Sequence, residues 1–261
     1  LHAFESSNPD IDFKYIIVNS DNECVAIALI QTIEVSIDVI LKNTKMPSFI
    51  MRILYSLFCK DHLKIIFCGN VFLSGEHGIL INENQNKVEA IKAICVEINN
   101  IAKQTKPLHA IFIKDFLEAS RTYTDYFKYC GFTPMHVEPN MIISLKEEWK
   151  NFQEYKKSLK SKYRVKVNKA DQTSANLEAR FLSYEDLEHY KYDLQKLYEN
   201  TIANADFNAQ VLNLNTYIKL RFAYKDNFIV KAYFLNGKLV GFLSALANNH
   251  HLDAHFIGLD Y

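Results

Sequence analysis

The chain has no excess of charge of either sign, because 30 Lys and Arg residues balance 30 Asp and Glu residues. This balance excludes a chain devoted to binding nucleic acid or membranes, and we expect no DNA partner; any anionic partner must meet a local patch. Long apolar runs are also missing, since residues 25–30 and 35–41 are too short to cross a bilayer. The chain begins at Leu1 with no basic and apolar leader, so we expect a cut end and no secretory signal.

The cysteines show neither a disulfide framework nor a metal-ligand pattern. They are odd in number, and no CxxC pair or Cys/His cluster with ligand spacing is present. Most lie in apolar runs, as reduced core thiols do. We therefore expect no metal and a reducing, cytoplasmic compartment. The five residues are Cys24, Cys59, Cys68, Cys95 and Cys130.

What the chain does have is apolar material for a core, with 49% hydrophobic and 13% aromatic residues among 261. This is enough for one large or two modest domains. β-Rich runs at 15–18 and 25–30 flank a polar turn and predict a hairpin. Residues 46–57 favour a helix, 63–68 a strand and 71–81 an extended segment.

Helical and extended patterns alternate after this opening. Asn86, with Glu89 three residues later, predicts the start of a helix whose apolar residues recur up to Ala102. A strand at 108–113, a helix at 120–129 that stops at Gly131, and a strand ending at 141–143 follow. This order predicts a mixed α/β fold with a mixed sheet.

The pattern changes at Trp149, where aromatic residues share one face of an expected helix and lysines crowd the others. Beyond it we expect a strand at 177–182, helices at 184–203 and 211–224, and a hairpin turning at Asn236 and Gly237. A final strand covers 251–257. Both hairpins are followed by a strand with interior glycines, which indicates a diverged duplication.

We therefore expect three parts, with boundaries at 1–146, 147–176 and 177–261. The first is a domain without its opening helices, the second a basic aromatic linker helix. The third is a second domain that lacks its C-terminal half.

The order of elements resembles the GNAT acyltransferase fold. Two copies joined by an aromatic and basic helix resemble the tandem, Fem-like form, and residues 68–78 and 253–261 are similar to segments of bacterial, Bacteroidetes-type GNAT acyltransferases. The resemblance implies acyl-CoA as a co-substrate, with no bound cofactor. It also implies a glycine-rich, pyrophosphate-binding turn before a helix, but residues 82–86 supply no glycine there. The first domain is then a degenerate partner, and the donor site lies mainly in the second.

Amide-forming acyl transfer needs a base near neutral pKa and a proton donor for the leaving group. Strand periodicity places His251, Asp253 and His255 on one face, where a carboxylate can orient an imidazole. We take His255 and Asp253 as catalytic candidates, and Tyr261 as the group that protonates a leaving thiol. The alternative is that His255 and Asp253 are ordinary polar residues of a surface strand and that Tyr261 is a packed aromatic residue.

Two further sets are candidates for substrate binding. Glu76 and His77, between Gly75 and Gly78, suit a cleft for an amine, although flanking glycines also suit a simple turn. The stretch 155–170 has no acidic residue, so its positive field suits CoA phosphates, an anionic lipid surface or tRNA. A solvated amphipathic helix is the alternative. The basic candidates are Lys160, Lys162, Arg164 and Lys166.

Three functions are consistent with these features. The leading hypothesis is a cytoplasmic N-acyltransferase, peripheral to the inner membrane if its acceptor is lipid-like, that moves an acyl group from acyl-CoA to a lipid-like, cell-wall or amino-sugar amine. The second is Fem-like aminoacyl transfer from charged tRNA. The third is a non-catalytic binding or scaffold module, which the missing glycine turn favours. For either enzyme, we expect the 261 residues alone to be inactive.

Overall fold

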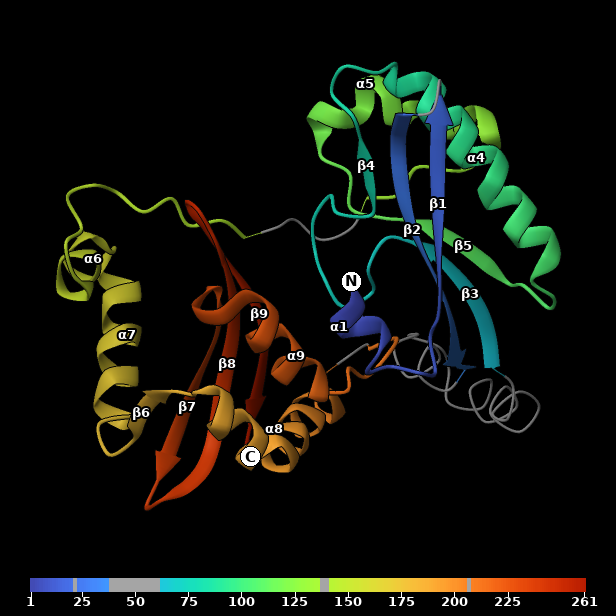
Figure 1. Cartoon of the computed structure of the whole chain (residues 1–261). Helices are drawn as coiled ribbons and strands as arrows, with labels where there is room; N and C mark the ends of the chain where they lie inside the picture. The colour runs from blue at the N-terminus through green and yellow to red at the C-terminus, as the bar shows by residue number, and fades with distance from the viewer. Residues whose placement is uncertain (21–22, 38–61, 137–140, 206–207) are drawn as a thin grey trace, which may run out of the picture.

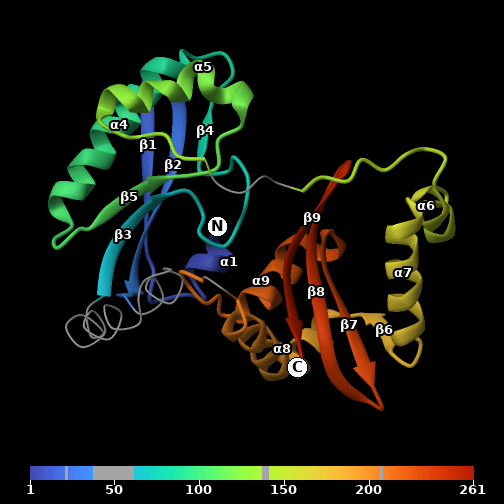
Figure 2. The same cartoon turned by 180° about the vertical axis from the view of Figure 1, so that it is seen from behind.

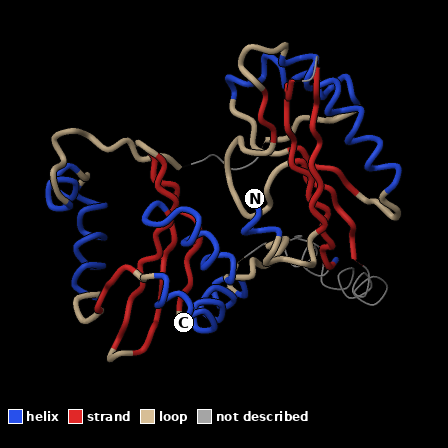
Figure 3. The backbone as a smooth tube through the Cα atoms, in the orientation of Figure 1, coloured by secondary structure: helices blue, strands red, loops and turns tan. Residues whose placement is uncertain are grey.

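The computed structural model describes residues 1–20, 23–37, 62–136, 141–205 and 208–261. These residues form one mixed and one antiparallel sheet, each with packed helices, and this confirms the expected mixed α/β class (Figure 1). Figure 3 shows the two sheets as separate groups of strands. Among the helices in this described part, none is long and apolar enough to span a membrane. The helix expected at 46–57 lies outside the described residues.

The first sheet has the strand order β1-β2-β3-β5, with β4 also paired to β2. The predicted hairpin is formed by the antiparallel strands β1 and β2, and β3 pairs antiparallel with the second half of β2. The last strand, β5, lies parallel to β3. The strands are β1 (Asp12–Ser20), β2 (Glu23–Ser36), β3 (His62–Cys68), β4 (Ile79–Ile81) and β5 (Ala110–Ile113).

One face of this sheet is covered by α4 (Lys87–Gln104), the helix that the sequence predicted most clearly. The side-chain oxygen of Asn86 accepts hydrogen bonds from the backbone N–H groups of Val88 and Glu89, at 3.1 and 3.2 Å. This cap satisfies two of the helix's free amide groups. The buried face of α4, which includes Ile91, Ile94 and Ile98, packs on apolar residues of β1, β2 and β3.

The helix predicted at 120–129 is a composite of short turns. A 3₁₀ turn, η1 (Glu118–Ser120), leads into α5 (Arg121–Thr124) and then into a second 3₁₀ segment, η2 (Asp125–Cys130). It ends at Gly131, as predicted, because Gly131 adopts a left-handed conformation with φ of 89°.

The prediction that the cysteines are reduced thiols is wrong for two of them. Cys95 of α4 and Cys130 at the end of η2 form a disulfide, with Cα atoms 6.4 Å apart. The two elements pack against each other, so residues 35 positions apart in sequence meet. Cys24 is an exposed free thiol, and burial raises the pKa of the Cys68 thiol to about 12. Cys59 lies outside the described residues.

The connection between the sheets differs from the prediction in two ways. Residues 141–143 form no strand and are exposed, since no neighbouring strand in the described chain offers them hydrogen-bond partners. The expected single helix is a pair, α6 (Phe152–Ser158) and α7 (Ser161–Thr173), because Leu159 and Lys160 are extended. The ammonium group of Lys156, 2.5 Å from the carboxylate of Asp171, ties the two helices together.

The second sheet is an antiparallel meander with the order β6-β7-β8-β9. The turn between β7 and β8 has Asn236 and Gly237 at φ of 50° and 78°, as the hairpin signal predicted. The elements are β6 (Glu178–Phe181), α8 (Tyr184–Ala203), α9 (Asn215–Tyr224), η3 (Lys225–Asn227), β7 (Phe228–Leu235), β8 (Lys238–Asn248) and β9 (His251–Leu259).

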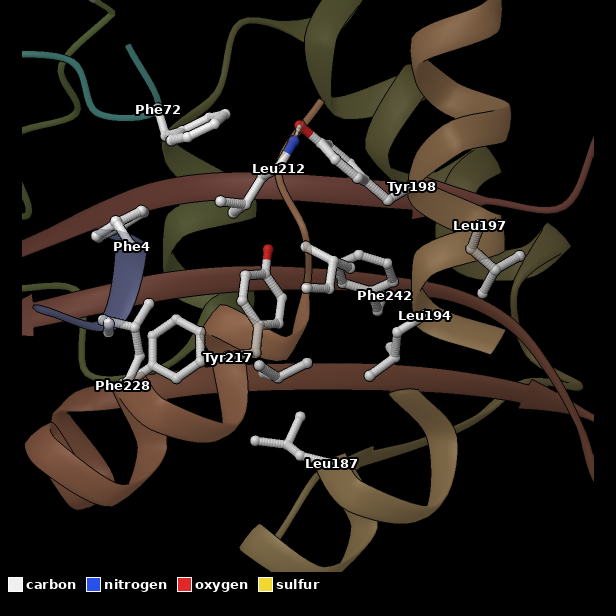
Figure 4. Packing of buried hydrophobic residues seen from close by; sticks show 14 of the residues in the cluster. Phe4, Phe72, Leu187, Leu194, Leu197, Tyr198, Leu212, Tyr217, Phe228 and Phe242 are labelled. Carbon is white, nitrogen blue, oxygen red and sulfur yellow. Dashed lines mark hydrogen bonds between the residues drawn. The ribbon is translucent and has the colours of Figure 1, made fainter. Parts of the chain in front are cut away.

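The helices α8 and α9 pack on one face of this sheet and also reach the first sheet. Tyr217 and Phe242 lie at the centre of the cluster shown in Figure 4. The same cluster includes Phe4 of α1 (His2–Glu5) and Phe72 from the first part of the chain, whose rings stack at 6.0 Å. The two sheets are therefore joined through apolar contacts and not only through the connecting chain.

Candidate functional site

A loop of residues 69–78 leaves the first sheet between β3 and β4, which are two halves of one strand line along β2. Leu29 of β2 holds both ends of this loop: its carbonyl oxygen accepts from Gly69 N, and its N–H donates to the oxygen of Gly78, each at 2.9 Å. A Cβ atom on Gly78 would lie 2.7 Å from the Cα atom of Gly69. Glycine is therefore required where the loop leaves and rejoins the sheet.

Polar side chains from β2 and from the end of β5 form hydrogen bonds with the backbone of this loop. The ammonium group of Lys114, just after β5, donates to the carbonyl oxygens of Asn70 and Leu73 at 2.9 and 2.7 Å and pairs with Asp115. The side-chain oxygen of Gln31, which is fully buried, accepts from the N–H of Val71 at 2.7 Å. These contacts fix the loop above the ends of β3 and β5.

Three buried side-chain atoms around this loop have no hydrogen-bond partner: Nε2 of Gln31, Nδ2 of Asn70 and Oε1 of Glu76. Unsatisfied buried polar atoms are uncommon, and each calls for an explanation such as a ligand or an ordered water. They lie near the carboxyl ends of the parallel strands β3 and β5, where ligands bind in open α/β sheets. The loop region therefore offers two donors and one acceptor to a polar group.

Strand β9 of the second sheet meets this loop at a β-bulge. Ala254 pairs with Ala245 and Ile257 with Leu243, so two residues of β9 lie opposite the single residue Ser244. The hydroxyl of Ser244 accepts from the N–H of Phe256 at 3.0 Å and fills the gap in the ladder. A bulge interrupts the alternation of side chains along a strand.

At this bulge His255 links the two parts of the chain. Its Nε2 lies 3.1 Å from the carbonyl oxygen of Phe72, and its Nδ1 lies 3.3 Å from the hydroxyl of Ser244 and 3.5 Å from that of Tyr217. Because a carbonyl only accepts, Nε2 carries the proton and Nδ1 accepts from a hydroxyl. Figure 4 shows Tyr217 in the core beneath Phe72 and Phe4.

The electrostatics keep this network neutral. Burial lowers the pKa of His255 to about 4, although the bond to Phe72 opposes the shift. Burial also raises the pKa of Tyr217 above its ordinary value. His255 is thus a neutral imidazole at neutral pH, with one N–H group and both ring nitrogens engaged. Its basic nitrogen is Nδ1, which can accept a proton from a substrate only when the hydroxyls of Ser244 and Tyr217 release it.

The structure brings only some of the predicted catalytic residues together. His255 lies at the junction, whereas Asp253 is exposed and makes no described hydrogen bond or ion pair with it. The partners that orient the imidazole are Ser244 and Tyr217. Tyr261 is exposed, beyond Asp260, whose carboxylate pairs with Lys238 at 2.6 Å.

The predicted substrate-binding pair lies in the loop that His255 contacts. Glu76 is half-buried with its unpartnered oxygen, and His77 is exposed and folds its ring back toward Gly75. The N–H of His77 donates to the oxygen of Gly75 at 2.9 Å, so this segment is also the tight turn that the sequence allowed.

The basic candidates lie elsewhere, on α7 and just before it. Figures 1 and 2 place α6 and α7 on the far side of the second sheet from the first sheet. Lys160, Lys162 and Lys166 are exposed, and Arg164 donates to the carbonyl oxygen of Lys157 at 3.2 Å. The basic surface and the loop region are therefore separate features.

Sequence reasoning missed most residues that surround His255 and the loop. Gln31 belongs to an apolar strand, and Lys114, Tyr217 and Ser244 belong to segments without a motif. A polar residue inside an otherwise apolar strand, as Gln31 is, was the one available signal. Within the described ranges no three His, Cys, Asp or Glu side chains are grouped to hold a metal ion.

No protein-family model and no curated protein matches the chain. Among solved structures, a crystal structure of FemX aligns with 89% of this chain and 51% of its own, at 18% sequence identity and a TM-score of 0.42. The chain thus spans about half the length of that structure.

Proposed function

We propose that this chain belongs to a transferase that moves an aminoacyl group from charged tRNA to an amine. The observation that carries this proposal is the basic surface of α7. Lys162, Lys166 and Lys169 lie at spacings of four and three residues and share one helix face. None of their side chains has a partner among the described hydrogen bonds and ion pairs.

This surface is costly to α7 unless an anion covers it. Like charges four residues apart destabilise a helix by roughly 0.2–0.5 kcal/mol per pair. The acidic residue that follows, Asp171, is already paired with the buried Lys156. Exposed Tyr163 stands beside the lysines and offers a ring on which a base can stack. Together these features suit a polyanion that carries bases.

Acyl-CoA is the less favoured acyl donor, because the helix of the first sheet offers a poor site for its pyrophosphate. A helix N-terminus binds a pyrophosphate through free backbone N–H groups. At α4 the side chain of Asn86 already accepts from two of these groups, and Glu89 adds a negative charge in the first turn. A CoA pyrophosphate would have to displace the cap and approach this carboxylate.

The acceptor amine is assigned to the loop 69–78. The unpartnered carboxylate oxygen of Glu76 suits an ammonium group, and the unpartnered amide groups of Gln31 and Asn70 suit its polar neighbours. In this proposal Nδ1 of His255 takes the amine's proton, once the hydroxyls of Ser244 and Tyr217 release it, and passes it to the tRNA hydroxyl that leaves as the new amide bond forms. A tRNA donor implies that the reaction occurs in the cytoplasm.

The test is a titration of fluorescent tRNA against the protein at several salt concentrations. Changing Lys162, Lys166 and Lys169 together to Gln should weaken binding and reduce the magnitude of the salt slope by about 2–3, because each lost phosphate contact removes roughly one counterion. The control carries Gln at Lys92, Lys103 and Lys191, which are lysines of α4 and α8. If both triple variants bind equally, the assignment of α7 is wrong.

Acyl-CoA and scaffold functions are separated by a second measurement. Ligand that binds only the folded state raises the thermal midpoint. A rise with acetyl-CoA or long-chain acyl-CoA, and none with tRNA, would replace the proposal with N-acyl transfer from CoA. Binding to neither donor would leave a non-catalytic module.

A further inference from the structure

We propose that a polar cavity at the C-terminal end of α4 binds a small zwitterion, namely a free amino acid or a short peptide with its amino and carboxylate groups. The cavity has a volume of about 680 Å³ and is distinct from the loop 69–78 and from α7. The inference does not depend on the proposed transferase activity.

The cavity exists because one face of the first sheet changes character where α4 ends. The part of this face under α4 is apolar and includes Ile16, Ile30 and Ile66. Past the cap residue Thr105, the same face continues with Asp12 and Thr32, which are paired in register. The helix therefore covers the apolar part and leaves the polar part as a cavity floor.

Two ion pairs lie on this floor, and in each pair a lysine and a carboxylate neutralise each other. Lys14 pairs with Asp12 at 3.0 Å, and Lys64 pairs with Glu34 at 3.2 Å. They line the cavity without leaving a net charge. Floor groups that are already paired do not attract a strongly charged ligand.

The rim adds one free charge of each sign. Asp10 and Lys106 both line the cavity, and neither takes part in an ion pair or side-chain hydrogen bond described in the structure. Lys106 follows the end of α4, and Gln210 reaches the cavity from the C-terminal part of the chain. With one carboxylate and one ammonium group free, the rim suits a ligand that carries the opposite two charges.

An unsatisfied buried group lies on the floor. Thr32 is 92% buried, because its exposed fraction is 8%, and its hydroxyl has no hydrogen-bond partner. A rotation about χ1 moves the hydroxyl of threonine to another staggered position. Because Thr32 lines the cavity, such a rotation turns the hydroxyl toward a ligand seated on the floor. The ligand's carboxylate then meets Lys106, its ammonium group meets Asp10, and its polar backbone meets Thr32.

The experiment uses L-alanine and L-alanyl-L-alanine as probes in an NMR titration of the whole chain. N-acetyl-alanine lacks the ammonium group, and alaninamide lacks the carboxylate. We expect at least one zwitterion to bind and each matched analogue of alanine to bind about tenfold more weakly, since one charge-assisted bond is lost. If neither zwitterion shifts resonances of cavity residues, the proposal is overturned.

Variants of the two rim residues test the pairing of charges. Asp10→Asn should weaken the binding of alanine about tenfold and leave the affinity for N-acetyl-alanine unchanged. Lys106→Gln should weaken the binding of alanine and leave the affinity for alaninamide unchanged. Lys103→Gln, one helical turn earlier and outside the cavity, and Asp193→Asn on α8 are the controls. Equal effects of the controls and the rim variants would contradict the assignment.

Thr32→Val separates binding from folding. Valine has the same shape and removes a hydroxyl that has no partner, so the free protein should unfold at the same or a higher urea concentration. The affinity for the zwitterion should fall several-fold. A Thr32→Val protein that binds with wild-type affinity rules out a ligand seated on this floor.

Discussion

The Nε2 atom of His255 lies 3.1 Å from the carbonyl oxygen of Phe72, although the two residues are 183 positions apart. Phe72 belongs to the loop of the first sheet, and His255 belongs to a bulge in the last strand of the second. The contact gives the joint between the two parts a polar bond inside an apolar cluster. It also makes this joint sensitive to the protonation of one imidazole.

The first prediction concerns this sensitivity. The pKa of His255 falls from 6.5 to about 4 on folding because the ring is buried. Between these values the unfolded chain binds the proton and the folded chain does not, so stability is lost as the pH falls from about 6.5 to about 4. The loss from this one group is at most about 3 kcal/mol.

The measurement is urea unfolding at pH 7, 5 and 4 for the wild type and His255→Gln. Glutamine keeps a donor for the oxygen of Phe72 and does not titrate in this range. Carboxylates elsewhere contribute equally to both proteins, so the difference isolates His255. If the free energy of unfolding changes with pH equally in the two proteins, the imidazole is not buried at the joint.

The second prediction concerns Gly78. Alanine there places its Cβ 2.7 Å from the backbone of Gly69, and neither backbone can move without breaking its bond to Leu29. Overpacking of this kind costs about 1–3 kcal/mol. Hydrogen exchange should become faster at the amides of Leu29 and Gly69. Gly131→Ala is the control: its Cβ meets no atom within 4 Å, and its strain comes only from the left-handed φ of 89° in η2, so it should leave these two amides protected.

How far the sequence predicts this molecule depends on the range of the interactions. The cap at Asn86 and the turn at Asn236 and Gly237 follow from residues a few positions apart, and the structure confirms both. Residues 141–143 have strand propensity, yet they form no strand, because a strand also needs a partner. Periodicity likewise cannot place a bulge, which here depends on the buried hydroxyl of Ser244.

The candidate site was predicted less completely than the fold. His255 and Glu76 were identified from their residue types, but their neighbourhood was not, because it is built across the two sheets. The disulfide was missed for the same reason, since Cys95 and Cys130 meet only when α4 packs on η2.

The third prediction concerns Lys114, whose ammonium group donates to two loop carbonyls and pairs with Asp115. Lys114→Met removes these bonds while it keeps the apolar stem beside Gly69. We expect a loss of about 1–3 kcal/mol, because partly buried acceptors are left without a donor. Hydrogen exchange should become faster at the amides of residues 69–78, and the amides that pair β1 with β2 should keep their exchange rates. Lys92→Met removes an exposed pair with Glu89 and an exposed contact with the Tyr126 ring, and it should change stability by less than about 1 kcal/mol.

The fourth prediction concerns the disulfide between Cys95 and Cys130. The bond closes a chain of 35 residues, and removing such a cross-link from the unfolded chain costs about 4 kcal/mol of stability in the chain-entropy model. Cys130→Ser should therefore lower the urea midpoint, and a reductant should lower the wild-type midpoint by a similar amount without affecting the variant. Cys24→Ser, at an exposed free thiol, should behave as the wild type in both conditions. If the reductant leaves the wild-type midpoint unchanged, the two cysteines are thiols in solution, and α4 and η2 are held by packing alone.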